Sequence, residues 1–432
     1  MNKKKINIAV VGLGQVGIYL LNELNTKKND IEIKTGKKIN IEAISAKNIN
    51  KKRRFKINKK IFYKNPLRIF KDKKIDVLFE VIGKSDGISK KIVETALKNK
   101  IHVITPNKAL IAKHGDQLTI LAEKNKVNLE FEASVAGGIP ILRTIKEGLA
   151  TNKIFKVYGI LNGTCNYILS EMENLKDSLQ NVLKRAQKLG YAEPTDPKFD
   201  LNGYDTLAKV RILSSLSFNT KISKDKCLME GIENIELEDI KIANDLNLRI
   251  KLLGISELLN NKIFERVYPC LVNKDSYIGN VNGVMNSVIL KGKPVGESML
   301  QGEGAGPGPT SSALMSDLLS ILRGNIKYPF GIPSYLRKRS SKFDMHKHIC
   351  SSYIRIEVKD IPGVLSSVTK IFAKNKISIK NLIQNPNKKN KKASIIIITH
   401  ESLEKNYNNL LLNLNKNKYL IKKPTFIRIE KI

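Results

Sequence analysis

A short stretch of the chain, residues 189–210, concentrates side chains that could carry out acid–base chemistry. Four carboxylates, Glu193, Asp196, Asp200 and Asp205, precede a lysine, Lys209, at its end. Two prolines and an Asn-Gly pair interrupt its first half, which predicts a loop, whereas the apolar spacing from residue 204 onward predicts a helix. Asp205 and Lys209 are four residues apart and therefore project from one face of that helix. The pair is either an ordinary surface ion pair, which contributes little to stability, or the reactive part of a site.

The N-terminal region carries the pattern of a dinucleotide-binding turn. Ile6–Val11 is a nearly continuous apolar run rich in β-branched residues, as in a strand buried on both faces. A GxGxxG motif follows it and then a helix-like pattern, which is the context that this motif requires. Its glycines let the backbone approach a pyrophosphate at a helix N-terminus. The residues of the turn are Gly12, Leu13, Gly14, Gln15, Val16 and Gly17.

The end of the second predicted strand, Ile39–Ala46, bears on the choice of cofactor. An NAD-selective site usually carries Asp or Glu there to bind the ribose 2′-hydroxyl. This chain has no acid at that point and continues with Lys47, which could pair with a 2′-phosphate. We therefore expect NADP in preference to NAD, with NAD possible. The alternative is that Lys47 is a solvated residue of a lysine-rich loop.

Further strands of this region deliver two more groups at their carboxyl ends. Strand Ile101–Ile104 leads to Lys108, at the edge where open α/β sheets place ligands. Strand Asn128–Glu132 runs into a turn of small residues, which can bend sharply and expose backbone carbonyls. Ile75–Ile82 is predicted to be another buried strand, and Ser85–Lys98 a helix.

The pattern changes after residue 134. Lys153–Leu161 alternates as a strand does, Leu179–Leu189 suits a helix, and Phe264–Leu290 favours strands and turns. Gln301–Thr310 is a glycine- and proline-rich crossing, followed by a predicted helix over Ser312–Leu322. The crossing is either a flexible linker or a turn that faces an anion or cofactor.

The C-terminal region reads as a separate unit with βαββαβ order, as in ferredoxin-like domains. A basic stretch with few apolar residues precedes it. Its predicted strands and helices are Tyr353–Val358, Val364–Ala373, Ile377–Ile379, Ser394–Thr399, Leu403–Leu414 and Thr425–Ile429.

These elements predict a mixed α/β and α+β protein. A Rossmann-like NAD(P)-binding domain would span residues 1–134 and be completed by about residues 305–335. An α+β catalytic and dimerisation domain would span residues 135–304. A linker at residues 336–349 would lead to the ferredoxin-like domain at residues 350–432.

Composition excludes several protein classes. No apolar run of the 432-residue chain approaches the ~18 residues of a membrane helix, and the basic N-terminus lacks the cleavage site of a signal peptide. Four cysteines lie far apart without a CxxC pair, so we expect reduced thiols and a cytoplasmic protein. The net charge of +36 permits nucleic-acid binding, but the lysines are scattered through every segment and no recognition motif accompanies them. We expect no nucleic-acid partner.

Taken together, the motifs resemble the homoserine dehydrogenase family, in its monofunctional form with a C-terminal ACT domain. The resemblance implies reversible NAD(P)-dependent hydride transfer between L-homoserine and L-aspartate 4-semialdehyde, a step towards threonine, methionine and isoleucine. The segments that carry it, besides residues 189–210, are GLGQVG (Gly12–Gly17), TPNKALIAKHG (Thr105–Gly115), FEASVAGGIPILRTI (Phe131–Ile145), GILNGTCNYIL (Gly159–Leu169) and GEGAGPGPTSS (Gly302–Ser312).

The resemblance also implies roles for individual residues. Lys209 would be the proton donor, and Lys108 would lie where nicotinamide and substrate meet and tune the acidity of Lys209. Glu193 and Asp205 would bind the substrate, with Asp200 in support. Beyond the glycine-rich turn and Lys47, the cofactor would contact Gly83, Gly190, Gly304 and Gly306.

Two further sites follow from the resemblance alone. A sodium ion would be bound largely by backbone carbonyls of Glu132, Val135, Gly137 and Ile139. In the ACT domain an effector, L-threonine, would bind at the turn that contains Asp360, Gly363, Val364 and Leu365, unless the domain serves only dimerisation. We expect a homodimer or homotetramer. The remaining alternatives are another NAD(P)-dependent dehydrogenase of amino-acid metabolism and a non-enzymatic basic nucleic-acid-binding protein.

Overall fold

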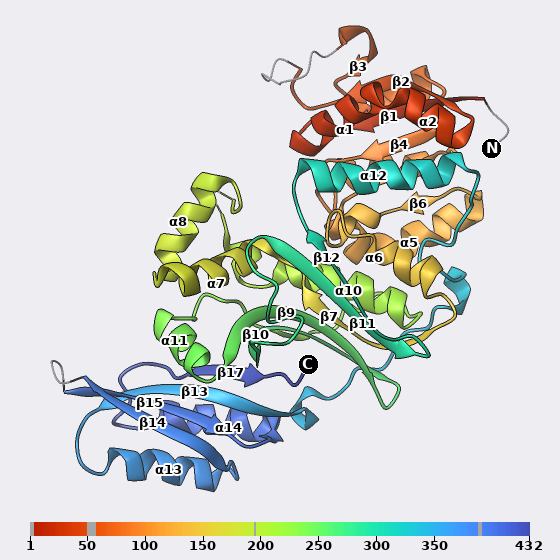
Figure 1. The fold of residues 1–432 in the computed structure, drawn as a ribbon. Helices are drawn as coiled ribbons and strands as arrows, with labels where there is room; N and C mark the ends of the chain where they lie inside the picture. Colours follow the sequence, from red (N-terminus) through yellow and green to blue (C-terminus); the bar gives the residue numbers. More distant parts are fainter. Residues whose placement is uncertain (1–3, 50–57, 194–195, 388–390) are drawn as a thin grey trace.

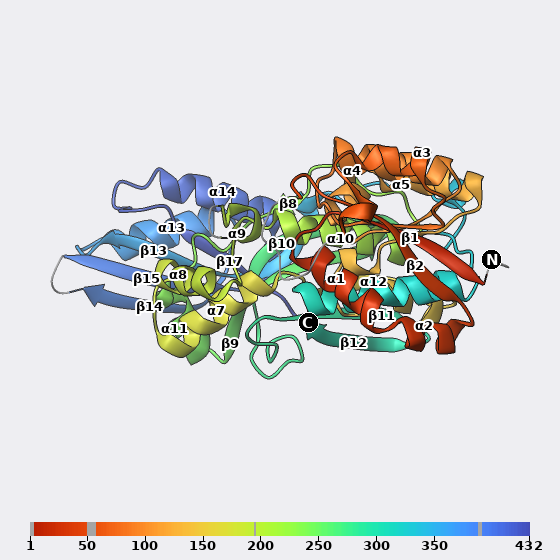
Figure 2. The ribbon, with the colours of Figure 1, turned by 90° about the horizontal axis from the view of Figure 1, so that it is seen from above.

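The computed structural model describes residues 4–49, 58–193, 196–387 and 391–432. Within them the chain forms two β-sheets, one of six strands and one of eleven. Figure 1 shows the six-stranded sheet with its helices at the N-terminal end of the molecule and the larger sheet running from the middle into the C-terminal part. Seen from above, the N-terminal and C-terminal parts lie at opposite ends (Figure 2).

The six-stranded sheet is parallel throughout and has the order β3-β2-β1-β4-β5-β6. The chain moves outward from β1 in one direction and then, from β4, in the other. This reversal makes a crevice at the carboxyl ends of β1 and β4, where such sheets bind ligands. The predicted Rossmann-like domain is confirmed. Its strands are β1 Lys5–Val11, β2 Lys38–Ser45, β3 Phe62–Tyr63, β4 Val77–Glu80, β5 His102–Ile104 and β6 Leu129–Glu130.

Both faces of this sheet are covered, because side chains along β1 alternate between two cores. Ile8 and Val10 pack with α1 and α12, whereas Ala9 and Val11 pack with α4 and α5. Helix α12 therefore returns from residues beyond 300 to complete the nucleotide-binding part, beside α1 (Figure 1). The helices of this part are α1 Gln15–Thr26, α2 Lys28–Thr35, α3 Ile69–Asp72, α4 Ile88–Lys98, α5 Lys108–Asn125 and α12 Pro307–Leu322.

The predicted start of α12 was wrong. The glycine- and proline-rich crossing was expected to extend to Thr310, but the helix begins at Pro307, because proline is tolerated in the first turn, where its missing N–H has no helical partner. Strand β12 continues to Glu303. The crossing therefore shrinks to three residues, 304–306.

The larger sheet has the order β12-β11-β7-β9-β10-β17-β13-β15-β14, with β8 beside β10 and β16 beside β13. Helix α10 lies on it directly: a Cβ at Gly254 of β9 would be 2.4 Å from Val210 Cγ2. The strands are β7 Lys153–Ile160, β8 Leu228–Met229, β9 Leu248–Leu259, β10 Lys262–Asn273, β11 Met285–Lys293, β12 Gly296–Glu303, β13 Ile349–Lys359, β14 Ile379–Asn387, β15 Lys392–Thr399, β16 Ser402–Leu403 and β17 Thr425–Ile429.

The remaining helices lie in the middle and C-terminal parts. In the middle part they are α6 Ile141–Arg143, α7 Gly163–Leu175, α8 Leu179–Leu189, α9 Lys198–Leu201, α10 Tyr204–Ser217 and α11 Leu237–Asp245, and in the C-terminal part α13 Val364–Lys374 and α14 Glu404–Asn415. The π-helical segment Thr144–Gly148 continues α6. Short 3₁₀ turns lie at Lys59–Ile61, Pro66–Arg68, Glu132–Ser134, Ser334–Leu336 and Met345–Lys347.

The C-terminal part has the predicted βαββαβ order, with one strand misplaced. The third element was expected at Ile377–Ile379, but β14 spans Ile379–Asn387. It is an edge strand, paired only with β15, and most of its residues are polar and exposed, so it lacks the apolar pattern on which the prediction relied.

The C-terminal part is also joined to the middle part by strand pairing and by backbone bridges from the segment that precedes it. Strand β17 runs parallel to β10, with Cys270 opposite Arg428. In the preceding segment Arg337 is buried, and the backbone at Lys338 and Lys342 bridges to residues of the middle part. None of the described helices is long and apolar enough to cross a membrane.

Candidate active site

Asp205 lies at the centre of a buried ionic cluster. Helix α10 begins after Gly203, whose left-handed φ of +89° turns the chain into the helix and places Asp205 in its first turn. Oδ2 of Asp205 is 2.8 Å from Lys209 Nζ, and Oδ1 is 2.8 Å from Lys108 Nζ. Asp205 and Lys209 are 3% and 7% exposed. Asp205 and Lys209 therefore form a buried ion pair, and Lys108 of the nucleotide-binding part joins it as a third member.

The two lysines differ in their surroundings. Lys209 also donates to the Leu161 carbonyl at the end of β7, at 2.6 Å. Lys108 is the first residue of α5, and its side chain is 35% exposed. One lysine is thus fixed inside the middle part, while the other reaches it from the edge of the nucleotide-binding sheet.

Asn162, which the sequence did not single out, completes the cluster. Its Nδ2 donates to Oδ1 of Asp200 and to Oδ2 of Asp205, both at 3.0 Å. Its Oδ1 accepts from the N–H of Cys165 and so caps α7. The available signal was the Asn-Gly pair at residues 162–163, because asparagine is a favoured N-cap residue.

The cluster displaces the pKa values of its members. Burial, reinforced by the charge of Lys108, lowers the pKa of Lys209 despite the opposing charge of Asp205. Burial also acts to lower the pKa of Lys108, but the charge of Asp205 outweighs it and the pKa is raised. Burial and the charge of Asp205 raise the pKa of Asp200. Of the two lysines, Lys209 is therefore the one more disposed to give up a proton.

Lys108 is positioned by a buried carboxylate that the sequence analysis also missed. Glu80, at the end of β4, accepts from Thr105 Oγ1 at 2.7 Å and from Asn107 Nδ2 at 3.3 Å. Asn107 in turn caps α5 through Leu110 N–H. These bonds fix the carboxyl ends of β4 and β5 and hence the start of α5. The sequence signal that could have revealed Glu80 was a glutamate inside the apolar run Ile75–Ile82.

The glycine-rich turn has the shape that a dinucleotide needs. A Cβ at Gly12 would be 2.4 Å from the Val81 oxygen, and one at Gly17 would be 1.9 Å from the Gly12 oxygen, so both glycines are required by packing. Gly14 faces open space and precedes α1 without a side-chain cap. The uncapped helix N-terminus can therefore receive a pyrophosphate. Leu13 is buried behind the turn, whereas Gln15 and Val16 begin α1.

The other predicted cofactor residues lie at the edge of the sheet, before α12 and at the end of α8. Gly83, with φ of +90°, and Lys47, which is exposed after β2, lie at the carboxyl edge of the sheet. Gly306, with φ of +111°, precedes α12 without a side-chain cap, so a second open helix N-terminus lies beside α1. Gly190 ends α8 in the left-handed conformation, which gives it a structural reason to be glycine.

Comparison with known proteins agrees with this geometry. Three family models match: homoserine dehydrogenase over residues 140–319, the NAD binding domain of homoserine dehydrogenase over 12–132, and the ACT domain over 352–417. The homoserine dehydrogenase of Neisseria gonorrhoeae is 37% identical over 99% of both chains. The chain belongs to the homoserine dehydrogenase family. It is an NAD(P)-dependent oxidoreductase with a C-terminal ACT domain.

Two further homoserine dehydrogenases show how far the likeness extends. The Bacillus subtilis protein is 35% identical over 95% of both chains. The crystal structure of the Thiobacillus denitrificans protein superposes with a TM-score of 0.89 at 35% identity, covering 99% of this chain and 98% of that one. The likeness therefore includes the nucleotide-binding, middle and ACT parts.

In this family member the turn after β6 is tightly built. The carboxylate of Glu132 accepts the N–H groups of Leu142 and Arg143, each at 2.8 Å, and so caps α6. The carbonyls of Glu132 and Ile139 each accept one N–H. A carbonyl oxygen has two lone pairs, so both keep an acceptor site. A Cβ at Gly137 would be 2.6 Å from the Gly304 oxygen, which places this turn against the 304–306 crossing.

The structure leaves some predicted residues outside the cluster. Glu193 is exposed, and its backbone carbonyl accepts from Gln187 Nε2 at 3.1 Å. Residues 194 and 195, which follow it, lie outside the described part. In the ACT domain Gly363 starts α13 with φ of +85°, Val364 is buried, and Asp360 and Leu365 are exposed.

Proposed function

We propose that the chain interconverts L-aspartate 4-semialdehyde and L-homoserine with Lys209 as the proton donor and acceptor. The observation that supports this most is the sharing of one buried carboxylate, Asp205, by a lysine of the nucleotide-binding part and a lysine of the middle part. When bound, the reduced nicotinamide supplies the hydride. As the aldehyde carbon receives it, negative charge grows on the oxygen, and the Lys209 ammonium stabilises that charge and transfers a proton to it. In the reverse direction neutral Lys209 removes the hydroxyl proton.

In this proposal Asp205 has two tasks. It keeps Lys209 in place, and the free acceptor capacity of Oδ1 serves the substrate ammonium together with Glu193 and Asp200. Lys108 lowers the pKa of Lys209 through its like charge and lies where the substrate oxygen and the cofactor meet. Burial and the neighbouring charge of Asp205 raise the pKa of Asp200, and a bound ammonium would act to lower it again.

We further propose that NADP is preferred over NAD. Supporting this, Lys47 is exposed directly after β2, where an NAD-selective site would carry an acid. Sodium is proposed as a second ligand, held by the carbonyls of Glu132, Val135, Gly137 and Ile139. Carbonyl oxygens suit a hard cation. Replacing sodium by choline at constant ionic strength should lower activity, and unchanged activity would refute the site.

For the ACT domain we propose feedback inhibition by L-threonine at the turn around Asp360. The continuous sheet through β10 and β17 supports a regulatory rather than a merely tethered domain. Titration of the full chain with L-threonine should inhibit it, and Asp360→Ala should weaken inhibition while leaving uninhibited turnover unchanged. Equal sensitivity in both proteins would leave a dimerisation role as the better explanation.

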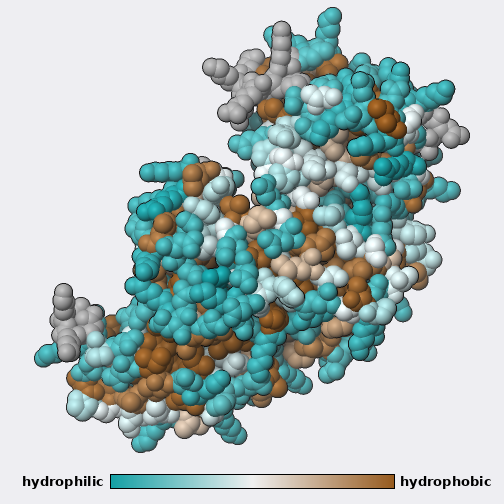
Figure 3. Space-filling model, in the orientation of Figure 1, coloured by the Kyte–Doolittle hydropathy of each residue, from teal (hydrophilic) through white to brown (hydrophobic). Residues whose placement is uncertain are grey.

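The wider setting follows from the proposed reaction. The enzyme would act in the cytoplasm, on the route to threonine, methionine and isoleucine, as a homodimer or homotetramer. An apolar area over the strands of the ACT sheet offers one contact surface (Figure 3), and Ile383 of the edge strand β14 is 41% exposed there.

Reduction of NADP+ and NAD+ in the presence of L-homoserine tests the proposal. Wild type should reduce NADP+ faster at equal concentrations, and reduction should depend on homoserine. Lys209→Ala should retain cofactor binding and lose turnover. Another amino-acid-pathway dehydrogenase would show no homoserine dependence, and near-full turnover by Lys209→Ala would remove this lysine from the mechanism.

A further inference from the structure

Asn286, at the start of β11, has a buried amide that the protein leaves without a partner. The side chain is 1% exposed, and neither its Oδ1 nor its Nδ2 has a hydrogen-bond partner. Among the described residues it is the only side chain for which two buried polar atoms are in this state. Leaving a buried polar group unpaired is costly, and such groups in folded proteins usually have a partner that the protein itself does not supply.

The neighbouring buried asparagines are fully engaged. Asn162 binds Asp200 and Asp205 and caps α7. Asn166 donates to three backbone carbonyls and accepts from Lys251 Nζ at 3.1 Å. Of these three asparagines, only Asn286 keeps both its donor and its acceptor without a partner in the protein.

The position of this amide is defined by two glycines. A Cβ at Gly304 would be 2.0 Å from both Cγ and Nδ2 of Asn286, and a Cβ at Gly163 would be 3.3 Å from its Oδ1. The amide therefore occupies the space that these two residues leave open. Gly304 is glycine because Asn286 lies against it.

Those glycines connect the amide to both halves of the site. Gly163 directly follows Asn162, which binds Asp205 of the lysine cluster. Gly304 precedes Gly306, the open N-terminus of α12 beside α1. The amide thus packs against one residue next to the lysine cluster and one residue near the N-terminus of α12. Hydride transfer requires the nicotinamide to lie beside that cluster while the cofactor phosphates lie at the helix ends.

We propose that Asn286 binds the primary carboxamide of the nicotinamide ring and thereby sets which face of the ring is turned towards the substrate. A carboxamide offers one acceptor and one donor, which match the free Nδ2 and Oδ1 of Asn286. The ionic ends of homoserine are instead matched by the charged groups around Asp205. The inference rests on the proposed cofactor position.

Binding of the cofactor in the absence of substrate tests this role. The dissociation constants of NADPH and of its 3-acetylpyridine analogue, in which a methyl group replaces the carboxamide NH₂, are measured by calorimetry. Wild type should bind NADPH about threefold to tenfold more tightly than the analogue, as expected for one neutral hydrogen bond. In Asn286→Ala this ratio should fall to about one, because the Oδ1 acceptor for the carboxamide NH₂ is lost. Asn286→Asp keeps an acceptor for the NH₂ group but loses the donor to the carbonyl oxygen, so it should bind both cofactors more weakly and still favour NADPH.

Asn128→Ala is the matched control. Asn128 is also 1% exposed, but its amide is paired within the protein, with the Asn325 carbonyl and the Lys327 N–H. This variant should lose stability and keep the wild-type ratio. Equal binding of both cofactors by wild type, or a wild-type ratio in Asn286→Ala, would overturn the proposal alone. Absence of NADPH binding by wild type would overturn the proposed function as well.

Discussion

Two of the buried ionic clusters in the described part of the chain are organised in opposite ways. In the active-site cluster one carboxylate, Asp205, is shared by two lysines. In the cluster that joins the ACT domain to the body, one arginine, Arg355, is shared by carboxylates. It binds Asp239 of α11 with two bonds, of 2.7 and 3.1 Å, and contacts Glu236 and Glu357 at 3.1 Å and Glu238 at 3.7 Å.

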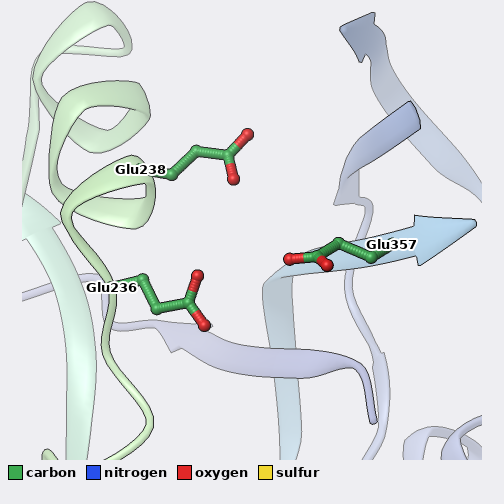
Figure 4. Close-up of side chains that lie close together, drawn as sticks. All are labelled: Glu236, Glu238 and Glu357. Carbon is green, nitrogen blue, oxygen red and sulfur yellow. The ribbon is translucent and has the colours of Figure 1, made fainter. Parts of the chain in front are cut away.

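Figure 4 shows three of these carboxylates facing one another, Glu236 and Glu238 from the α11 side and Glu357 from β13. Such a group could hold a metal ion. Here the positive charge comes from the protein, since Arg355 and Lys422 pair with the same carboxylates. The cluster is therefore a clamp between the ACT domain and the body.

The pKa directions separate the two clusters. Burial acts to lower the pKa of Arg355, but the bonds to Asp239 outweigh it and the pKa is raised, so the guanidinium stays charged. Burial and a like charge lower the pKa of Lys209. The carboxylates around Arg355 keep it charged, whereas burial and the neighbouring charge of Lys108 make Lys209 a better acid. The first suits a structural contact and the second suits proton transfer.

Removing the central residue of the active-site cluster should give the largest effect on activity. Asp205→Asn should lower kcat/KM about 10²- to 10⁴-fold, because both lysines lose their counter-charge and the substrate loses a carboxylate. Stability should change little, since Lys209 can release its proton and Lys108 is partly exposed. Steady-state kinetics with thermal unfolding measure both. A large loss of stability with intact kcat/KM would show that the cluster is structural.

Removing the central residue of the ACT clamp should give the opposite pattern. Arg355→Met leaves the carboxylate of Asp239, which is 1% exposed, without its cationic partner. Loss of one member of a buried ion pair typically costs about 3–5 kcal/mol. The free energy of unfolding should fall by that order, while turnover of the folded protein remains. The double variant with Asp239→Asn should recover much of the loss. A large loss of kcat with little loss of unfolding free energy would contradict a purely structural role for this cluster.

The lysine pair should respond to pH in a defined direction. Semialdehyde reduction needs protonated Lys209 and should decline as pH rises through its lowered pKa, whereas homoserine oxidation should rise over the same range. Lys108→Met removes a like charge, so the pKa of Lys209 should increase and both profiles should shift to higher pH. Lys108→Arg retains the charge and should keep the wild-type midpoint. A shift to lower pH in Lys108→Met would show that Lys108 does not tune Lys209.

The smallest effect is expected at the exposed end of β2, outside both clusters. Lys47→Ala should lower kcat/KM for NADP about threefold to tenfold and leave the NAD value unchanged, since a solvent-exposed contact to phosphate is weaker than a buried one. Lys98→Ala, an exposed lysine at the end of α4, is the matched control. Equal effects on both cofactors would assign Lys47 to general electrostatic attraction.

Much of the fold could be predicted because its signals are local. The apolar run of β1, the glycine-rich turn and the helix after it follow one another directly, and the four-residue spacing of Asp205 and Lys209 fixes a shared helix face. Prediction failed where the local pattern was weak. Strand β14 is a polar edge strand, and α12 begins with a proline that looked like part of a loop.

By itself, the sequence determined which segments form strands and helices, which turn suits a dinucleotide, and that Asp205 and Lys209 lie together. The tertiary structure decided the partners. Asn162 meets Asp205 from 43 residues away, and Arg355 meets Asp239 from 116 residues away. The period of the backbone places neighbours along one element, but only the order of strands in a sheet decides which distant ends meet and how deeply their charges are buried.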